Sequence, residues 1–200
     1  MPIESLPADI RESYEVHEWR HASAILEQDF PNEFEDICDV LSRFRLYQSA
    51  ILEPGGRKSV ISGWIDAEFY KKGWSEKKFD TKITLDDIDF ESPTHSVDCF
   101  KNRVALEIEW NNKDPFYDRD LNNFRLLFDL RAISVGIIIT RSDELQDIFR
   151  NLGRKDSFGA STTHMSKLLP RIQGGGGAGC PLLVFGITKK LYVEDRPAVR

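Results

Sequence analysis

Three acids in the middle of the chain could do chemistry together. Asp98 is followed, after eight intervening residues, by Glu107 and Glu109, which form a Glu-x-Glu pair. Residues 104–110 alternate along an apolar, partly β-branched run, which predicts a strand. Residues i and i+2 of a strand point to the same face, so the two glutamates are expected side by side. Their mutual repulsion would be relieved by a divalent cation, and oxygen ligands favour Mg²⁺.

This layout suits metal-dependent cleavage of a phosphodiester. We expect Asp98, Glu107 and the carbonyl of Ile108 to be metal ligands. Glu109 would orient or deprotonate the attacking water, or hold a second metal. The alternative is a partly exposed strand with solvated glutamates. The apolar neighbours on both sides favour a strand inside a sheet, where unpaired carboxylates are costly.

The surrounding pattern predicts the elements that position these acids. Helical spacing is seen at 31–44, 62–73 and 116–130, and Ser142 is expected to cap a helix that runs to about 152. Residues 132–140 have the apolar content of a buried central strand, and 180–188 predict a last core strand. The stretch 153–177 is polar and glycine-rich, and is read as a loop.

The order of these elements predicts an α/β sandwich with a mixed β-sheet and helices on both faces. A length of 200 residues suits one domain. Within it we expect an N-terminal helical part at 1–50 and a catalytic core with recognition loops at 51–190.

Composition limits the function classes further. No apolar run is long enough for a transmembrane helix, and the first residues do not have the pattern of a signal peptide. Cys38, Cys99 and Cys180 are odd in number and widely spaced, as in reduced thiols of a cytoplasmic protein. The net charge of -6 argues against a passive, charge-driven nucleic-acid binder, but not against a nuclease whose acids hold metal.

The spacing Asp98-x8-Glu107-x-Glu109 resembles the PD-(D/E)-x-K nuclease pattern, with Glu in place of Lys. More narrowly, residues 101–110 resemble the active-site strand of the BglII/BstYI group of type II restriction endonucleases. Those enzymes carry Glu-Val-Gln on this strand, whereas their structural relative BamHI carries Glu-x-Glu. Further segments at 71–76, 171–175 and 181–187 resemble the same group in the same order, so the resemblance covers 50–190 in patches.

The resemblance implies a restriction-endonuclease-like sandwich that cuts double-stranded DNA with Mg²⁺ as a homodimer. It also implies 5′ overhangs and a palindromic site with a GATC-like centre. A cognate DNA methyltransferase would act on the same site without forming a stable complex. Two alternatives stay open at this point: a repair or structure-specific nuclease on the same fold, and a non-catalytic DNA-binding or partner-binding module.

Several polar residues are candidates for contacts with DNA. Asparagine suits adenine, and lysine suits guanine or phosphate, so the segment that ends the catalytic strand could read bases. A second polar loop and an arginine before a glycine-rich stretch could do the same, although ordinary surface turns are the alternative. The candidates are Asn111, Asn112, Lys113, Asp114, Ser161, Thr162, Thr163, His164 and Arg171.

A second acid-x-acid pair, Asp66 and Glu68, lies in the predicted helix 62–73. Residues i and i+2 do not share a face of a helix. We therefore rank this pair well below Glu107 and Glu109.

Overall fold

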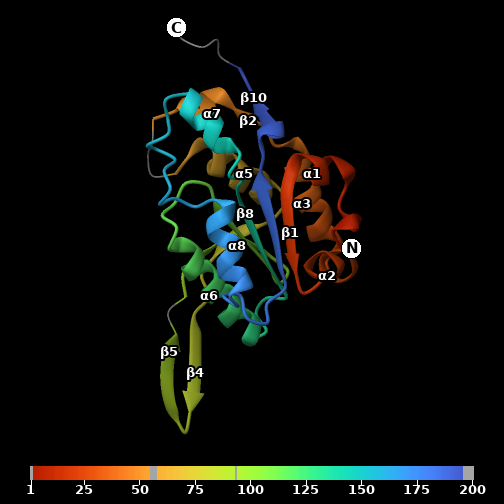
Figure 1. Cartoon of the computed structure of the whole chain (residues 1–200). Coiled ribbons are helices and arrows are strands. Elements are labelled where there is room, and N and C mark those ends of the chain that lie inside the picture. Colours follow the sequence, from red (N-terminus) through yellow and green to blue (C-terminus); the bar gives the residue numbers. More distant parts are fainter. Residues whose placement is uncertain (1, 55–57, 93, 196–200) are drawn as a thin grey trace.

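The computed structural model describes residues 2–54, 58–92 and 94–195. Its centre is a six-stranded mixed sheet (Figure 1). In sheet order the strands are β1 (Tyr14–Trp19), β9 (Leu182–Ile187), β8 (Val135–Arg141), β7 (Val104–Glu109), β6 (Val97–Lys101) and β3 (Ser75–Lys77). Strands β7, β8 and β9 run parallel, and the other pairs in the sheet are antiparallel. The predicted α/β fold with a mixed sheet is confirmed.

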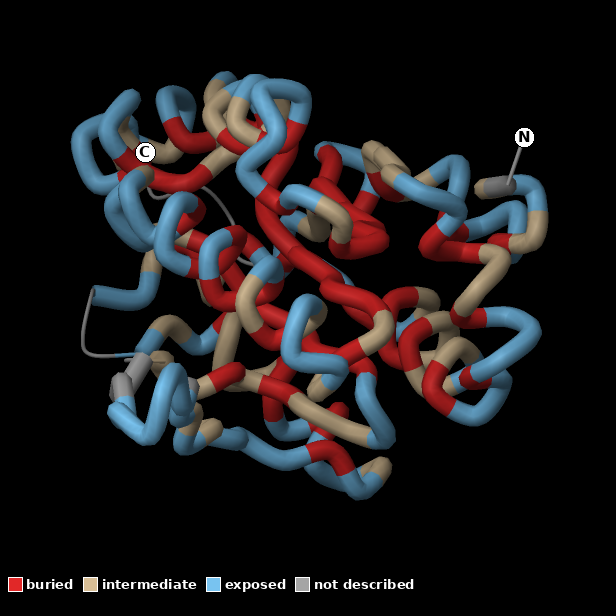
Figure 2. Tube along the Cα trace, turned by 90° about the horizontal axis from the view of Figure 1, so that it is seen from below, coloured by how far each residue is buried: buried red, intermediate tan, exposed pale blue. Residues whose placement is uncertain are grey.

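Helices cover both faces of this sheet. The helices are η1 (Pro2–Ser5), α1 (Ala8–Ser13), α2 (Ala22–Asp29), α3 (Pro31–Arg43), α4 (Gln48–Leu52), α5 (Val60–Lys71), α6 (Phe116–Asp129), α7 (Leu145–Asn151), α8 (Met165–Gln173) and η2 (Lys189–Leu191). Helices α1 to α5 and α7 belong to one hydrophobic core, and α6 and α8 belong to the other. Figure 2 shows the buried residues gathered in the interior of the molecule and the exposed residues around its periphery.

Two small strand pairs stand apart from the main sheet. Strands β2 (Leu46–Tyr47) and β10 (Tyr192–Val193) pair in parallel. Strands β4 (Thr81–Leu85) and β5 (Ile88–Ser92) form a hairpin that projects from the body of the molecule (Figure 1).

The strand with the two glutamates is buried along its whole length, and its side chains alternate between the cores. Val104, Leu106 and Ile108 belong to the core on the α5 side. Ala105 belongs to the core on the α6 side, and Glu107 and Glu109 follow it on that face because a strand repeats every second residue. Strand β7 therefore presents carboxylates to α6 and apolar side chains to α5.

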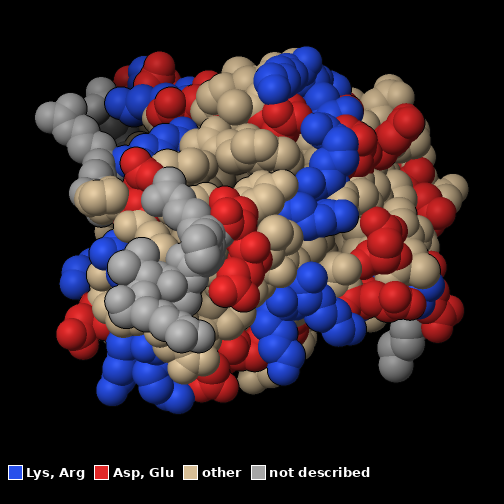
Figure 3. Space-filling view, turned by 90° about the horizontal axis from the view of Figure 1, so that it is seen from above, with Lys and Arg blue, Asp and Glu red and all other residues tan. Residues whose placement is uncertain are grey.

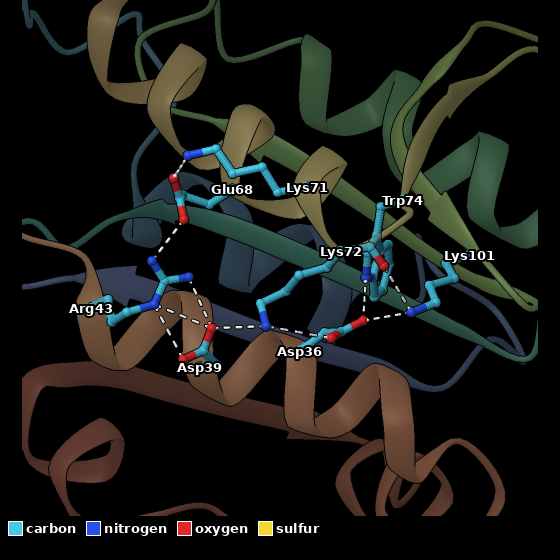
Figure 4. A network of polar contacts seen from close by, with 8 residues as sticks. All are labelled: Asp36, Asp39, Arg43, Glu68, Lys71, Lys72, Trp74 and Lys101. Carbon is cyan, nitrogen blue, oxygen red and sulfur yellow. Dashed lines mark hydrogen bonds and ion pairs between the residues drawn. The ribbon is translucent and has the colours of Figure 1, made fainter.

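A polar network fixes α5 against α3 and the edge of the sheet (Figure 4). Asp36 of α3 accepts hydrogen bonds from the Trp74 indole at 2.9 Å and from the ammonium of Lys101, on β6, at 2.8 Å. Arg43 of α3 pairs with Glu68 of α5 at 2.7 Å. The network therefore sets the position of α5 relative to β6, and with it the position of Asp66.

Two local predictions are wrong. Ser142 does not cap a helix: its N–H donates to the Ile187 carbonyl at the end of the sheet, and α7 begins at Leu145 with Glu144 as the N-cap residue. The stretch 153–177, read as a loop, contains α8. Met165, Leu168 and Ile172 of α8 are buried at helical spacing, but Pro170 and the neighbouring glycines disguise the pattern.

Close packing between β8 and α6 generates a stability prediction. A Cβ atom at Gly136 would lie 2.7 Å from Phe124 and 2.9 Å from Leu182. We expect Gly136→Ala to lower the free energy of unfolding by about 1–3 kcal/mol, measured by urea denaturation. The control is Gly63→Ala in α5, where an added Cβ meets nothing within 4 Å. The control should keep or slightly raise stability, by up to about 1 kcal/mol. A Gly136→Ala protein as stable as its parent would contradict the described packing.

Candidate active site

Asp98 and Glu107 are joined where the pairing of β6 and β7 ends. The regular register runs from Lys101 opposite Val104 to Cys99 opposite Leu106. Beyond this register, carboxylate side chains accept the hydrogen bonds of the backbone N–H groups. The Ile108 N–H donates to Asp98 Oδ2 at 2.9 Å, and the Asp98 N–H donates to Glu107 Oε2 at 3.3 Å. Each carboxylate is therefore oriented by the opposite strand.

On the α5 side, Asp98 faces a cavity of about 690 Å³ that Ile108 and Trp110 also line. Asp66 and Lys58 lie on its wall as well. Lys58 forms an ion pair with Asp66, and the Cys99 thiol donates to Asp66 at 3.6 Å. Burial raises the pKa of the Asp98 carboxyl, the hydrogen bond from Ile108 lowers it, and the charge of Asp66 raises it further. Asp66 and Asp98 therefore act on each other electrostatically across the cavity.

Asp66, which the sequence reasoning ranked low, lies on the wall of the same cavity as Asp98. Asp66 and Glu68 indeed have different partners, because Glu68 pairs with Arg43 and Lys71 at the other side of the helix. One feature of the sequence could have indicated this position of Asp66. Asp66 directly follows Ile65 in the apolar repeat of Ile61, Ile65 and Phe69, and this repeat is buried. An acid at a buried helical position needs a partner or a function.

On the α6 side, Glu107 and Glu109 form a second cluster with His95, Arg119 and Asp120. His95 Nε2 lies 3.2 Å from Glu107 Oε1 and 3.1 Å from Asp120 Oδ1. Glu109 Oε1 lies 3.6 Å from the Arg119 guanidinium. Both glutamates are only 1% exposed. They reach this cluster from the face of β7 opposite to the Asp98 cavity.

The electrostatics of this cluster favour an added positive charge. Burial, with Asp120 and Asp98 nearby, raises the pKa of Glu107 to about 8. Burial and Asp120 raise the pKa of Glu109 to about 10. Burial lowers the pKa of His95, but its bonds to Asp120 and Glu107 outweigh this and raise it to about 9. These carboxylates hold protons near neutral pH, and a divalent cation could take the place of those protons. The residues therefore fit a metal ion.

The structure places the two predicted DNA-contact segments against each other. Lys113 and Thr162 form an isolated antiparallel β-bridge. The Asp114 N–H donates to the Ser161 carbonyl at 3.0 Å. The Asn112 N–H donates to Thr163 Oγ1 at 3.1 Å. The Asn112 amide also donates to Glu109 Oε2 at 2.9 Å. The paired segments therefore lie beside the acidic centre.

These candidates differ in exposure and in their partners. Asn112, Lys113 and Ser161 are exposed, whereas Thr162 and Thr163 are buried. The Asn111 side chain donates to the Ser157 carbonyl. His164 bonds Asp143 at 2.7 Å, and Arg171 pairs with Asp118 at 2.8 Å. The last two therefore already have carboxylate partners on the protein.

Arg141, at the end of β8, holds the buried part of this loop. Its guanidinium donates to the Thr163 carbonyl at 2.9 Å and to Thr162 Oγ1 at 2.5 Å. It also lies over the rings of Phe149 and Phe158. Thr162 and Thr163 therefore fix the loop from inside.

A mixed sheet with an acidic centre at the fork of two antiparallel strands defines a restriction-endonuclease-like nuclease. The family model described as "Restriction endonuclease BglII/BglIII" matches residues 14–187, and the chain belongs to this family. It is thus a type II site-specific deoxyribonuclease, and the family implies a double-stranded DNA substrate and a divalent metal. No curated protein matches the chain.

The family match confirms the resemblance and extends it. It begins at Tyr14, the first residue of β1, whereas the resemblance found in the sequence began near residue 50. In the structure, β1 pairs along its length with β9 at the end of the sheet. Among the described residues, no helix combines the length and apolar character that a membrane crossing requires.

The buried cluster generates a prediction on pH. In the unfolded chain, Glu107 loses its proton above a pKa of about 4.5 and His95 above about 6.5. In the native protein both residues keep their protons to higher pH. The native state therefore binds more protons between about pH 6.5 and 8, and its stability falls as pH rises through this window. In EDTA we expect the free energy of unfolding to fall by about 1 kcal/mol or more per pH unit.

The measurement is urea denaturation at pH 6.5, 7.2 and 8.0, with EDTA and with a divalent metal. A bound metal should flatten the fall, because it replaces the protons. Stability that stays level or rises across this window in EDTA would show that the cluster does not hold these protons.

Proposed function

We propose that this chain hydrolyses phosphodiester bonds of double-stranded DNA with Mg²⁺, at a palindromic site with a GATC-like centre, and leaves 5′ overhangs. The observation that carries the proposal is the exchange of hydrogen bonds between Asp98 and the β7 residues Glu107 and Ile108. It fixes two acids of the predicted spacing at one point of the sheet, as the family's chemistry requires.

Asp98, Glu107 and the Ile108 carbonyl would hold the metal. The Ile108 N–H is directed at Asp98, and the N–H and C=O of one strand residue point to the same side of the strand. When bound, Mg²⁺ acts as a Lewis acid on the phosphate and lowers the pKa of bound water. Asp98 and Asp66 supply negative charge on the wall of the cavity, and Lys58 forms an ion pair with Asp66.

Glu109 would orient or deprotonate the attacking water. In the metal-free protein, burial and Asp120 hold its proton, so it becomes a base only when positive charge lowers its pKa. Arg119 and the Asn112 amide are the groups that already stabilise its charged form. Through Asn112 this carboxylate is also linked to the proposed recognition segment.

The proposed recognition surface is formed by the segment 111–114 with the loop 157–164, and Arg171 is included. Exposed Asn112, Lys113 and Ser161 would face the DNA, while buried Thr162 and Thr163 keep the loop in shape. Asn111, Asp114 and His164 would complete this surface.

Among the residues that the structure describes, the face shown in Figure 3 has no broad surface of a single charge sign. On the face shown in Figure 3, basic and acidic side chains are interspersed. With a net charge of -6, duplex binding must depend on local contacts in the cleft more than on the overall field.

We propose a homodimer, because two copies would bring one cutting centre to each strand of a palindromic site. The whole of 1–200 would act as one nuclease domain in the cytoplasm, with 51–190 as its catalytic core and the N-terminal part adding β1. A DNA methyltransferase would modify the same site without a stable complex.

The direct test is Glu107→Gln, which keeps the shape of the buried side chain and removes its charge. We expect Mg²⁺-dependent plasmid cleavage to fall roughly 10³-fold or more, since a lost metal ligand removes several kcal/mol of transition-state stabilisation. Duplex binding, measured by gel shift in Ca²⁺, should survive.

The matched control is Glu27→Gln in α2, an exposed glutamate outside the acidic centre and outside the network that positions α5. This variant should cut within a few-fold of the parent rate. If Glu107→Gln cuts at the rate of the control, Glu107 is not a member of the cutting centre.

A further inference from the structure

The second cluster contains three metal-ligating side chains from three different parts of the chain. His95 comes from the segment before β6, Glu107 from β7 and Asp120 from α6. Each offers one ligand atom, and these atoms lie within 4.8 Å of one another. A metal-binding site is formed in this way, by side chains that converge from separate elements.

Asp120 has a buried oxygen to spare. The residue is fully buried, and its Oδ1 accepts from Arg119 at 2.8 Å and lies 3.1 Å from His95 Nε2. Its Oδ2 has no hydrogen-bond partner among the described residues. A buried carboxylate oxygen without a partner is costly unless a cation or a proton meets it.

A second unpartnered group lies one turn further along α6. Asn123 is 3% exposed, and neither its amide nitrogen nor its amide oxygen has a partner in the described part of the chain. A cavity of about 220 Å³ lies beside it, lined by Asn123, His95 and Arg119. The cavity gives an ion and its water ligands a way into the cluster.

We propose that His95, Glu107 and Asp120 form a second divalent-cation site, distinct from the one at Asp98 and selective for Mn²⁺, Co²⁺ or Zn²⁺ over Mg²⁺. An imidazole ligand suits these transition metals, whereas Mg²⁺ prefers an all-oxygen shell. The proposal rests on the proposed function in one respect only, the use of Glu107 by both sites.

Glu107 is oriented to serve both sites at once. Its Oε2 accepts from the Asp98 backbone, on the side of the proposed catalytic metal, and its Oε1 faces His95 and Asp120. Occupation of the second site would fix Glu107 and neutralise part of the cluster's negative charge. It would thereby hold a ligand of the catalytic metal in place.

The test counts Mn²⁺ bound to the full chain without DNA and records nitrogen coupling to Mn²⁺ by electron spin-echo spectroscopy. We expect two Mn²⁺ per chain, one of them coupled to an imidazole nitrogen. His95→Gln and Asp120→Asn should each lose one Mn²⁺, or bind it at least 10-fold more weakly, and His95→Gln should lose the nitrogen coupling. His164→Gln, which changes a histidine paired with Asp143, is the control and should keep both signals.

Asp98→Asn separates the two proposals. It should remove the ion without nitrogen coupling and leave the coupled one. If His95→Gln keeps two Mn²⁺ and the nitrogen coupling, the second site is wrong. If Asp98→Asn loses no ion while His95→Gln loses the coupled one, the second site stands and the catalytic metal assignment fails. The His95 side chain is 21% exposed, so its replacement by glutamine should not prevent folding. The thermal unfolding curve of the variant tests whether it is folded.

Discussion

The candidate active centre depends on the point where backbone pairing between β6 and β7 ends and side chains bond to the opposite backbone instead. Asp98 accepts the Ile108 N–H, and Glu107 accepts the Asp98 N–H. Both backbone donors are thereby satisfied without continuing the ladder, so the strands can diverge at no loss of hydrogen bonds. The divergence makes room for the cavity beside Asp98, while the Glu107 carboxylate is held on the α6 side of the sheet.

The surrounding strands and basic side chains stabilise this fork against the repulsion between its carboxylates. Strands β7 and β8 pair along six residues, and both are buried throughout, so β7 cannot move to relieve repulsion. Positive groups lie on both faces of the sheet: Lys58 by Asp66 on one side, and His95 and Arg119 by Asp120 on the other. Burial, with Asp120 nearby, nevertheless raises the pKa values of Glu107 and Glu109. A divalent cation is the natural complement of such a site.

Local periodicity was enough to predict strands β7, β8 and β9, the helices with apolar repeats, and the placing of Glu107 and Glu109 on one face of a strand. The helix α5 and the buried strand β8 follow directly from their patterns. Asp66, His95 and Asp120 could not be grouped with the centre from sequence, because they are 12 to 41 residues from Glu107 and only tertiary packing brings them together. Helix α8 was missed since Pro170 and the glycines after it outweigh its short apolar stripe.

The Asp98–Glu107 fork is proposed to cut DNA at a defined site. The most direct test of this proposal is to digest a sequenced plasmid with the purified protein and Mg²⁺ and to map the ends. We expect discrete fragments whose ends share one palindromic sequence and carry 5′-phosphate overhangs. Cleavage without a common sequence, or equal cleavage in EDTA, would contradict the proposal.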